Sequence, residues 1–266
     1  MLPAWFRSVL FLSMSLVFAA LNSGSNANCY YVGNQEQAVL IDVGLSCSQT
    51  EARMQRLGLD PRRVKAIFVS HEHSDHVRGV PRLAKKYGLP VYVTPKTGRQ
   101  LSGLDQKLAV QSLADDVLVQ VGELQIHAFT KYHDAVDPLS FVVSQDGVNV
   151  GVFTDIGTPC DRLTYHFARC QAAFLEANYD EQMLEYGSYP HYLKQRIRGG
   201  HGHLSNQQAL DLFLTHRSAN LSHLILAHLS AQNNSPQVAH DLFRPHMGTT
   251  HLTVASRLSE TPLFSI

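Results

Sequence analysis

The stretch His71-Glu72-His73-Ser74-Asp75-His76 directly follows an apolar run typical of a buried β-strand, Val64-Lys65-Ala66-Ile67-Phe68-Val69-Ser70. Three imidazoles and two carboxylates at the end of such a strand bring nitrogen and oxygen ligands to one point, which is what a divalent metal ion requires. We therefore interpret these six residues as part of a metal site.

The spacing within the stretch separates two kinds of metal site. A zinc-protease helix of the type HExxH would need a second histidine where Asp75 stands, so that interpretation fails. In a tight loop, His71 and His73 can bind one metal ion while Asp75 and His76 turn toward a second, which favours a two-metal centre. The alternative is a surface turn that happens to be rich in histidine.

Three later residues are further candidate metal ligands, because each follows an apolar strand-like run. His133 lies just after the run that contains His127, Asp155 follows Val148–Thr154, and His228 follows Leu221–Ala227. An isolated carboxylate buried at a strand end costs several kcal/mol unless it is paired or binds a cation. Taken singly, His133 could be a plain loop residue and Asp155 a turn or helix-cap residue.

With its His-x-His-x-Asp-His signature after a strand, the sequence resembles the metallo-β-lactamase-fold hydrolases. The resemblance implies an α/β (α+β) fold, an αββα sandwich of two mixed sheets flanked by helices, with two divalent metal ions (Zn²⁺ or Mn²⁺). It also implies the seven ligands in order, namely His71, His73, Asp75, His76, His133, Asp155 and His228. In the mechanism we expect, Asp155 bridges the metals, a metal-activated hydroxide attacks phosphorus, and Asp75 orients that nucleophile or accepts its proton.

Three segments narrow the resemblance to the bacterial YycJ/VicX group of exonuclease-like proteins, also called WalJ. These are Leu175–Asp180, the segment from Leu193 through Ser205 to Asn206, and His228–Asn234. This resemblance implies a cytoplasmic exonuclease that degrades DNA from 5′ ends. The alternatives are another hydrolase of the fold, such as a cyclic phosphodiesterase or a glyoxalase II-like thioesterase, or a metal-bearing regulator that binds nucleic acid without cutting it.

A short basic run supports a phosphodiester substrate, since phosphate recognition needs cationic donors. The candidate substrate-binding residues are Lys194, Arg196, Arg198 and Ser205, with Asn178, Asn233 and Asn234 as weaker candidates for shaping the pocket, since Asn is also common in turns. The basic run could equally be a solvated helix face. Ser205 and Gln208 form a capping box for a helix over Asn206–Thr215, whose start would suit a phosphate oxygen. His203, just before it, is a candidate general acid or phosphate donor, or only a neighbour of the cap.

Composition limits the class of protein more than its function. With 266 residues and 44% hydrophobic residues, the chain can form one full core, and the formal net charge of zero gives no global attraction for nucleic acid or membrane. The four cysteines, Cys29, Cys47, Cys160 and Cys170, form no CxxC motif, which favours free thiols in a reducing compartment. The oligomeric state stays open, with a homodimer among the options.

The N-terminus contains an apolar run, Val9–Leu21, that resembles the core of a signal peptide but is shorter than the about 20 residues of a membrane span. We interpret Ser15–Leu21 as the first buried strand instead. Met14 is then the expected start of a single domain over residues 14–266, with residues 1–13 as a non-native or flexible extension and no membrane attachment.

Local patterns predict the remaining elements in outline. We expect a hairpin over Cys29–Val32 and Gln37–Asp42, and a helix over Ser48–Leu57 with Ser48 and Glu51 as its capping box. Leu108–Ser144 alternates in the manner of antiparallel strands, with turns at Asp115-Asp116, Val121-Gly122 and Gln145-Asp146-Gly147.

Overall fold

Two seven-stranded sheets form the centre of the molecule. In the computed structural model, which describes residues 15–101 and 108–266, the first sheet has the strand order β14-β1-β2-β3-β4-β5-β6. Its strands are β1 (Val17–Asn22), β2 (Cys29–Gly33), β3 (Ala38–Ile41), β4 (Val64–Phe68), β5 (Val91–Val93), β6 (Val110–Ser112) and β14 (Phe264–Ser265). The sheet is antiparallel from β14 to β3 and parallel from β3 to β6.

The second sheet has the same mixed design, in the order β13-β12-β11-β10-β9-β8-β7. Its strands are β7 (Val117–Val121), β8 (Leu124–Thr130), β9 (Leu139–Gln145), β10 (Val148–Phe153), β11 (Ala172–Glu176), β12 (His223–Ala227) and β13 (His251–Val254). Strands β7 to β10 pair antiparallel, and β10 to β13 pair parallel. Parallel strands must be joined by crossover connections, which places helices over the outer faces.

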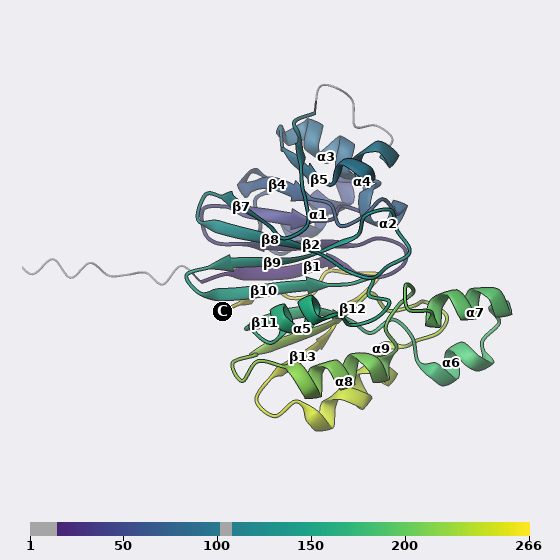
Figure 1. Ribbon diagram of the computed structural model, residues 1–266. Coiled ribbons are helices and arrows are strands. Elements are labelled where there is room, and N and C mark those ends of the chain that lie inside the picture. The colour runs from purple at the N-terminus through teal and green to yellow at the C-terminus, as the bar shows by residue number, and fades with distance from the viewer. Residues whose placement is uncertain (1–14, 102–107) are drawn as a thin grey trace, which may run out of the picture.

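The helices cover both outer faces of the stacked sheets (Figure 1). Those over the first sheet are α1 (Cys47–Arg56), α2 (Ser74–Val77), α3 (Val80–Tyr87) and α4 (Pro95–Gln100), with the 3₁₀ turn η1 (Pro61–Arg63). Those over the second are α5 (Asp161–Phe167), α8 (Asn206–His216) and α9 (Pro236–Phe243), with the 3₁₀ turn η2 (Arg244–His246). Helices α6 (Glu181–Tyr186) and α7 (His191–Arg198) instead form a lobe that projects from one side of the sandwich (Figure 1).

Three apolar layers hold this arrangement together. Phe18, Phe68, Phe141 and Phe174 pack between the two sheets, and all four side chains are fully buried. A second cluster fills the space between the first sheet and its helices, and a third lies under α5, α8 and α9. The order helix, sheet, sheet, helix confirms the predicted αββα fold.

The local predictions are mostly confirmed, with three corrections. The N-cap of helix α1 lies two residues earlier than predicted, because Ser46 and Gln49 form the capping box rather than Ser48 and Glu51. Strand β6 was expected in an antiparallel series, but it pairs in parallel with β5 in the first sheet. The metal-binding stretch is not wholly a loop, since the helical turn α2 begins right after His73.

The apolar N-terminal run is a strand in its described part. Strand β1 lies between β14 and β2 and is buried along nearly its whole length, as the sequence predicts. Met14 and residues 1–13 lie outside the described residues.

Candidate metal centre

The candidate ligands lie where strands of both sheets end. His71 to His76 follow β4, His133 follows β8, Asp155 follows β10 and His228 follows β12. Asp155 and His228 adopt left-handed backbone conformations with φ of 56° and 57°. Such a conformation costs a non-glycine residue of order 1 kcal/mol or more, and it is found most often at functional sites. It turns the chain sharply, so that both side chains remain buried at the sheet ends.

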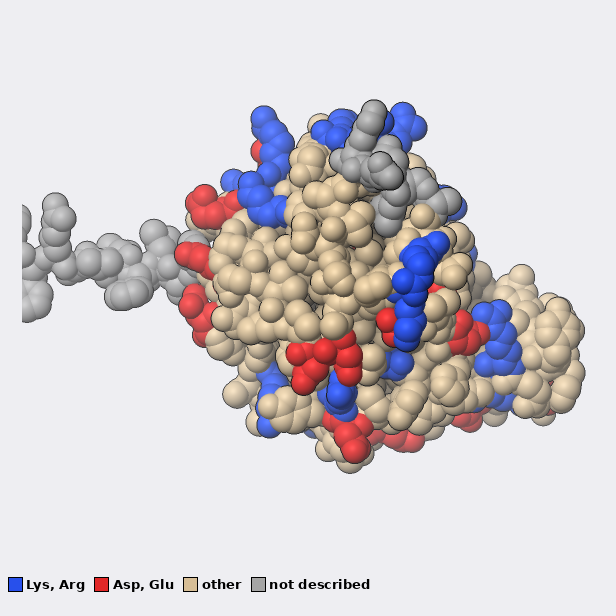
Figure 2. Space-filling view, turned by 45° about the horizontal axis from the view of Figure 1, so that its top comes forward, with Lys and Arg blue, Asp and Glu red and all other residues tan. Residues whose placement is uncertain are grey.

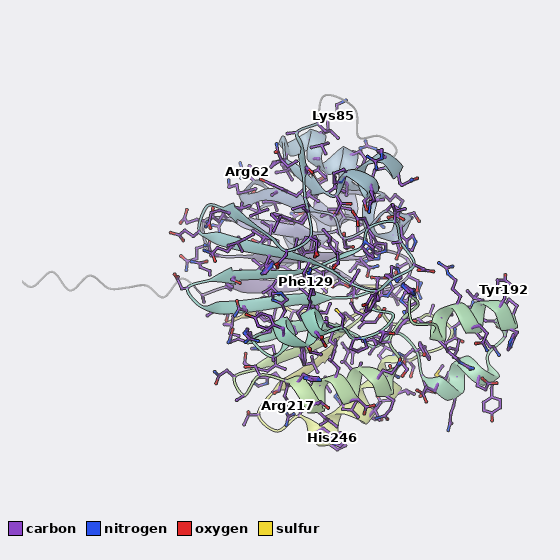
Figure 3. All side chains as sticks on the ribbon, viewed as in Figure 1. Arg62, Lys85, Phe129, Tyr192, Arg217 and His246 are labelled. Atoms are coloured by element: carbon purple, nitrogen blue, oxygen red, sulfur yellow. The ribbon has the colours of Figure 1, made fainter. Side chains whose placement is uncertain are left out.

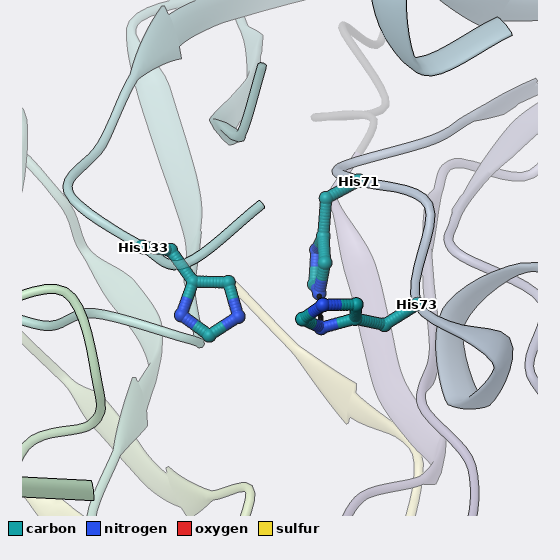
Figure 4. A group of neighbouring side chains, drawn as sticks. All are labelled: His71, His73 and His133. Carbon is teal, nitrogen blue, oxygen red and sulfur yellow. Dashed lines mark hydrogen bonds between the residues drawn. The ribbon is translucent and has the colours of Figure 1, made fainter. Parts of the chain in front are cut away.

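Three imidazoles form the first group (Figure 4). The Nε2 atom of His71 lies 3.1 Å from Nδ1 of His73. The His133 ring centroid lies 4.9 Å and 5.3 Å from those of His71 and His73, respectively. Ligands of a tetrahedral zinc ion, each about 2.1 Å from the metal, are roughly 3.4 Å apart. The first group therefore has the dimensions of a three-histidine metal site.

Asp75, His76 and His228 form the second group. Oδ2 of Asp75 lies 3.3 Å from Nε2 of His76 and 3.7 Å from Nε2 of His228. Asp155 faces both groups. Its Oδ2 lies 3.4 Å from His76 Nε2, and its Oδ1 lies 3.5 Å from His228 Nε2 and 3.8 Å from His133 Nε2. A carboxylate in this position can bridge two metal ions.

Hydrogen bonds on the far side of the rings fix which nitrogen faces the centre. His76 Nδ1 donates to Asp42 Oδ2 over 2.7 Å, and His228 Nδ1 donates to Glu176 Oε1 over 2.9 Å. His133 Nδ1 donates to the Gly202 carbonyl over 3.1 Å. Neutral rings that donate through Nδ1 keep the lone pair on Nε2, so these contacts orient Nε2 for metal binding.

Three of the inward-facing atoms are buried and have no hydrogen-bond partner within residues 15–101 and 108–266. They are His133 Nε2, His228 Nε2 and Asp155 Oδ2. Buried polar atoms are normally satisfied, and a lone pair left without a partner costs about 1–3 kcal/mol. Bound cations would satisfy all three at once, so the residues present fit a pair of divalent metal ions.

The electrostatics of the centre also favour cations. Burial disfavours ionised Glu176, but the His203 and His228 rings outweigh it and lower the pKa of the carboxyl to about 2. Burial by itself would lower the pKa of His228, yet Asp155, Asp75 and Glu176 raise it to about 10. Burial lowers the pKa of His133 to about 4, which keeps that ring neutral. The carboxylates thus require a positive charge, which either a proton on His228 or a bound cation can supply, whereas the His133 ring is available as a neutral ligand.

The sequence analysis missed four residues that support this centre. Asp42 and Glu176 orient the imidazoles, and Asn28 Nδ2 donates to Asp75 Oδ2 over 3.0 Å. Lys131 is buried and donates from Nζ to the Thr154 carbonyl over 2.7 Å. The sequence did contain a signal for Asp42 and Glu176, because each lies at the end of a buried strand as Asp155 does.

A cleft of 220 Å³ opens onto the metal centre. His73, Asp75, Asp155 and His228 form its polar side, and its other lining residues are Ser25, Asp134, Asn178, Tyr189, Leu193, Arg196, Ile197, Gly202, His203 and Ser230. Of the predicted catalytic and substrate-binding residues, the structure therefore brings Asp75, Asn178, Arg196 and His203 into this cleft.

The other four predicted substrate-binding residues do not line the cleft. Lys194 and Arg198 contact Glu185 of α6, by hydrogen bond and ion pair respectively. Ser205 is buried and caps α8 as predicted, with Oγ accepting from Gln208 N over 3.1 Å. Asn233 is also buried, and its backbone carbonyl accepts from Asp180 N. The start of α8 is therefore closed by its own capping box rather than open to a phosphate.

His203 lies beside both groups of candidate metal ligands. Its Nδ1 donates to Glu176 Oε1 over 2.8 Å, and its ring centroid is 5.2 Å from that of His133 and 5.3 Å from that of His228. The side chain keeps 21% of its surface exposed. Glu176 therefore fixes the ring, while the cleft gives substrate access to it.

The surface carries no single-signed face on the side that Figure 2 shows, where basic and acidic side chains are interspersed. All four cysteines are free thiols, as the sequence predicts. Within the described part of the chain, no helix is both long and apolar enough to span a membrane.

Comparisons with known proteins agree with the geometry. The family model described as the metallo-beta-lactamase superfamily matches residues 23–189. The chain is 36% identical over 232 residues to exodeoxyribonuclease YycJ of Bacillus anthracis, covering 85% of this chain and 87% of that protein. It is 32% identical to exodeoxyribonuclease WalJ of Streptococcus pneumoniae, covering 84% and 85%. Among solved structures, the metallo-beta-lactamase-fold protein YhfI of Bacillus subtilis aligns with a TM-score of 0.72 at 17% identity, covering 95% of this chain and all of that one, which supports the fold alone.

Proposed function

Because the chain belongs to the metallo-beta-lactamase superfamily, and is therefore a hydrolase of that fold, we propose that it is a binuclear metal-dependent DNA exonuclease that acts from 5′ ends. The observation that carries the proposal is the similarity to two proteins named exodeoxyribonucleases over about five sixths of the chain. The polar centre at the base of the cleft supports it, since the same residues suit a phosphodiester.

The ligand sets follow from the two groups. His71, His73 and His133 would hold one divalent ion, Asp75, His76 and His228 the other, and Asp155 would contact both. Bound there, Zn²⁺ or Mn²⁺ would neutralise phosphate oxygens and lower the pKa of a coordinated water. Both ions accept mixed histidine and carboxylate sites, so the choice between them depends on availability.

The chain's own side chains orient the substrate and handle protons. Arg196 lines the cleft and forms an ion pair with Asp134, which places a guanidinium where a non-bridging phosphate oxygen can reach it. Asn178 Nδ2 donates to the His228 carbonyl over 2.8 Å and so braces the cleft wall. Asp75 lies at the cleft floor, where it can accept the proton of an attacking water.

His203 is suited to proton transfer at the leaving oxygen. Since ionised Glu176 only accepts hydrogen bonds, the Nδ1 atom of His203 carries a proton and its Nε2 atom is the one that exchanges. His203 can therefore donate a proton from Nε2 when the phosphorus–oxygen bond breaks.

The remaining features complete the proposal. DNA is the proposed partner, and we place the protein in the cytoplasm as one domain over residues 14–266 with its cysteines reduced. The oligomeric state is open to measurement.

The test is cleavage of DNA labelled at either the 5′ or the 3′ end, with protein loaded with manganese or zinc. We expect metal-dependent release of 5′-terminal nucleotides, loss of that activity in Asp75→Ala, and wild-type activity in the control Asp241→Ala, whose exposed side chain lies on α9. Release from 3′ ends would overturn the proposed direction. DNA binding without cleavage would favour a regulator, and turnover of thioesters but not phosphodiesters would favour a thioesterase.

A further inference from the structure

One wall of the cleft has a different chemical character from its floor. The floor consists of metal-binding and ionisable side chains, whereas Tyr189, Leu193 and Ile197 contribute an aromatic ring and two aliphatic side chains. Leu193 and Ile197 are four residues apart on α7, so they share one face of that helix. Tyr189 immediately precedes the N-cap Pro190 and lines the same cleft. We call these three residues the α7 wall.

The α7 wall is fixed relative to the metal centre by backbone contacts. His203 N donates to the Ile197 carbonyl over 2.9 Å, and the Gly202 carbonyl accepts from His133 Nδ1. The end of α7 is thus hydrogen-bonded to the segment that contains His203 and that also accepts a hydrogen bond from His133. Gly202 permits this close approach, because a Cβ there would lie 2.2 Å from the Ile197 carbonyl oxygen.

A second contact ties α7 to the floor near its middle. Arg196, between Leu193 and Ile197, pairs with Asp134, whose Oδ1 is 3.4 Å from His133 Nε2. The helix therefore presents a cation and an apolar surface to one cleft. A nucleotide has the matching pair of features, an anionic phosphodiester and a flat base whose faces can pack on an apolar surface.

The size of the cleft limits how much DNA it can hold. Pockets that enclose drug-sized ligands measure about 300–1,000 Å³, so a cleft of 220 Å³ holds no more than about one nucleotide. A base still paired within a duplex would bring its partner strand with it. A base that enters this space must first be unpaired, as enzymes that act on bases in confined pockets require.

We propose that the α7 wall is the binding site for the base and sugar of a single unpaired terminal nucleotide, with the Tyr189 ring stacking on the base. The proposal rests on the proposed exonuclease function and adds the form of DNA that it takes. Stacking on an aromatic ring tolerates any base, because every base has a π-face. The site therefore selects unpaired ends without selecting sequence.

The test compares two single-stranded oligonucleotides that differ only in whether the 5′-terminal nucleotide carries a base. Wild-type protein, Tyr189→Ala, Tyr189→Phe and the control Tyr192→Ala are assayed for KM and kcat. Tyr192 lies on the same helix but does not line the cleft, is 74% exposed and sits far out on the lobe (Figure 3). Thermal melts establish that each variant is folded.

We expect Tyr189→Ala to raise KM for the normal oligonucleotide about 5- to 140-fold, the range for loss of base stacking, with little change in kcat. Tyr189→Phe keeps the ring and should stay near wild type, as should Tyr192→Ala. For the oligonucleotide without a terminal base, wild-type protein should already have the raised KM, and Tyr189→Ala should add nothing. An equal effect of Tyr189→Ala on both oligonucleotides, or none on either, would overturn the base site.

Equilibrium binding of the metal-loaded proteins, measured by fluorescence anisotropy, separates this proposal from the exonuclease assignment. If wild-type protein cleaves neither oligonucleotide but binds the one with a base more tightly, and Tyr189→Ala removes that difference, the base site stands and the exonuclease function falls. If the Kd responds neither to the base nor to Tyr189, the base site falls whether or not DNA is cleaved.

Discussion

Replacing Glu176 with glutamine tests whether this buried carboxylate sets the proton positions of the metal centre. Its Oε2 accepts from Ile156 N over 2.8 Å and from Leu204 N over 3.1 Å. Its Oε1 accepts from the Nδ1 atoms of His203 and His228. A glutamine has one accepting oxygen, so either pair of donors must face its NH₂ group. The backbone donors cannot change, whereas an imidazole can move its proton.

The expected rearrangement follows from that difference. In Glu176→Gln, the amide oxygen should stay with the two backbone N–H groups and the NH₂ group should face the rings. His228 then becomes an acceptor at Nδ1 and carries its proton on Nε2, the atom that binds metal. Loss of such an orienting partner typically weakens metal binding about 10- to 100-fold, or about 1.4–2.8 kcal/mol. The group formed by His71, His73 and His133 does not contact Glu176 and should keep its affinity.

The assay is competitive titration of metal-free protein with zinc against a chromophoric chelator, which resolves two dissociation constants. Glu185→Gln is the matched control, because this exposed residue pairs with Arg198 and does not line the cleft. In Glu176→Gln we expect a shift only in the dissociation constant of the site formed by Asp75, His76 and His228. Unchanged dissociation constants in a folded variant would refute the reasoning, as would a loss confined to the three-histidine site.

Two further predictions concern stability and thiol chemistry. At a free metal concentration of about 100 times the Kd, removing the metal should lower the free energy of unfolding by about 2.7 kcal/mol per site. For a domain of this size, that loss lowers Tm by roughly 5–10 °C. Calorimetry with and without a chelator measures the change, and an unchanged Tm would count against resident metals. Burial raises the pKa of the Cys29 and Cys170 thiols, so both should remain protonated and unreactive toward a thiol reagent at about pH 8. The half-buried Cys160 should react first, and labelling of Cys29 or Cys170 in the native protein before denaturant is added would contradict the expected protection.

The seven candidate ligands, which the structure brings close together, could be chosen from the sequence because apolar strands precede them and the family resemblance implies the set. His71, Asp155 and His228 are where a strand ends, and strands of this fold carry their site residues at one edge. Asp42 and Glu176 end strands in the same way, yet their carboxylates face the backs of imidazoles rather than the centre. Which side of a ring a carboxylate meets depends on how the strands of the two sheets are placed, and a single-chain pattern does not contain that information.

Helix geometry explains why only part of the predicted basic run lines the cleft. Lys194, Arg196 and Arg198 are spaced two residues apart, and residues i and i+2 of a helix point in widely different directions. Lys194 and Arg198, four residues apart, share one face of α7 while Arg196 lies on another, so the three cannot all face one cleft, and Arg196 is the one that lines it. The other two turn toward Glu185, whose hydrogen bond and ion pair hold α6 against α7. Leu193 and Ile197 line the cleft together with Arg196. The orientation of α7 that points Lys194 and Arg198 away from the cleft therefore also places these two aliphatic side chains in its wall.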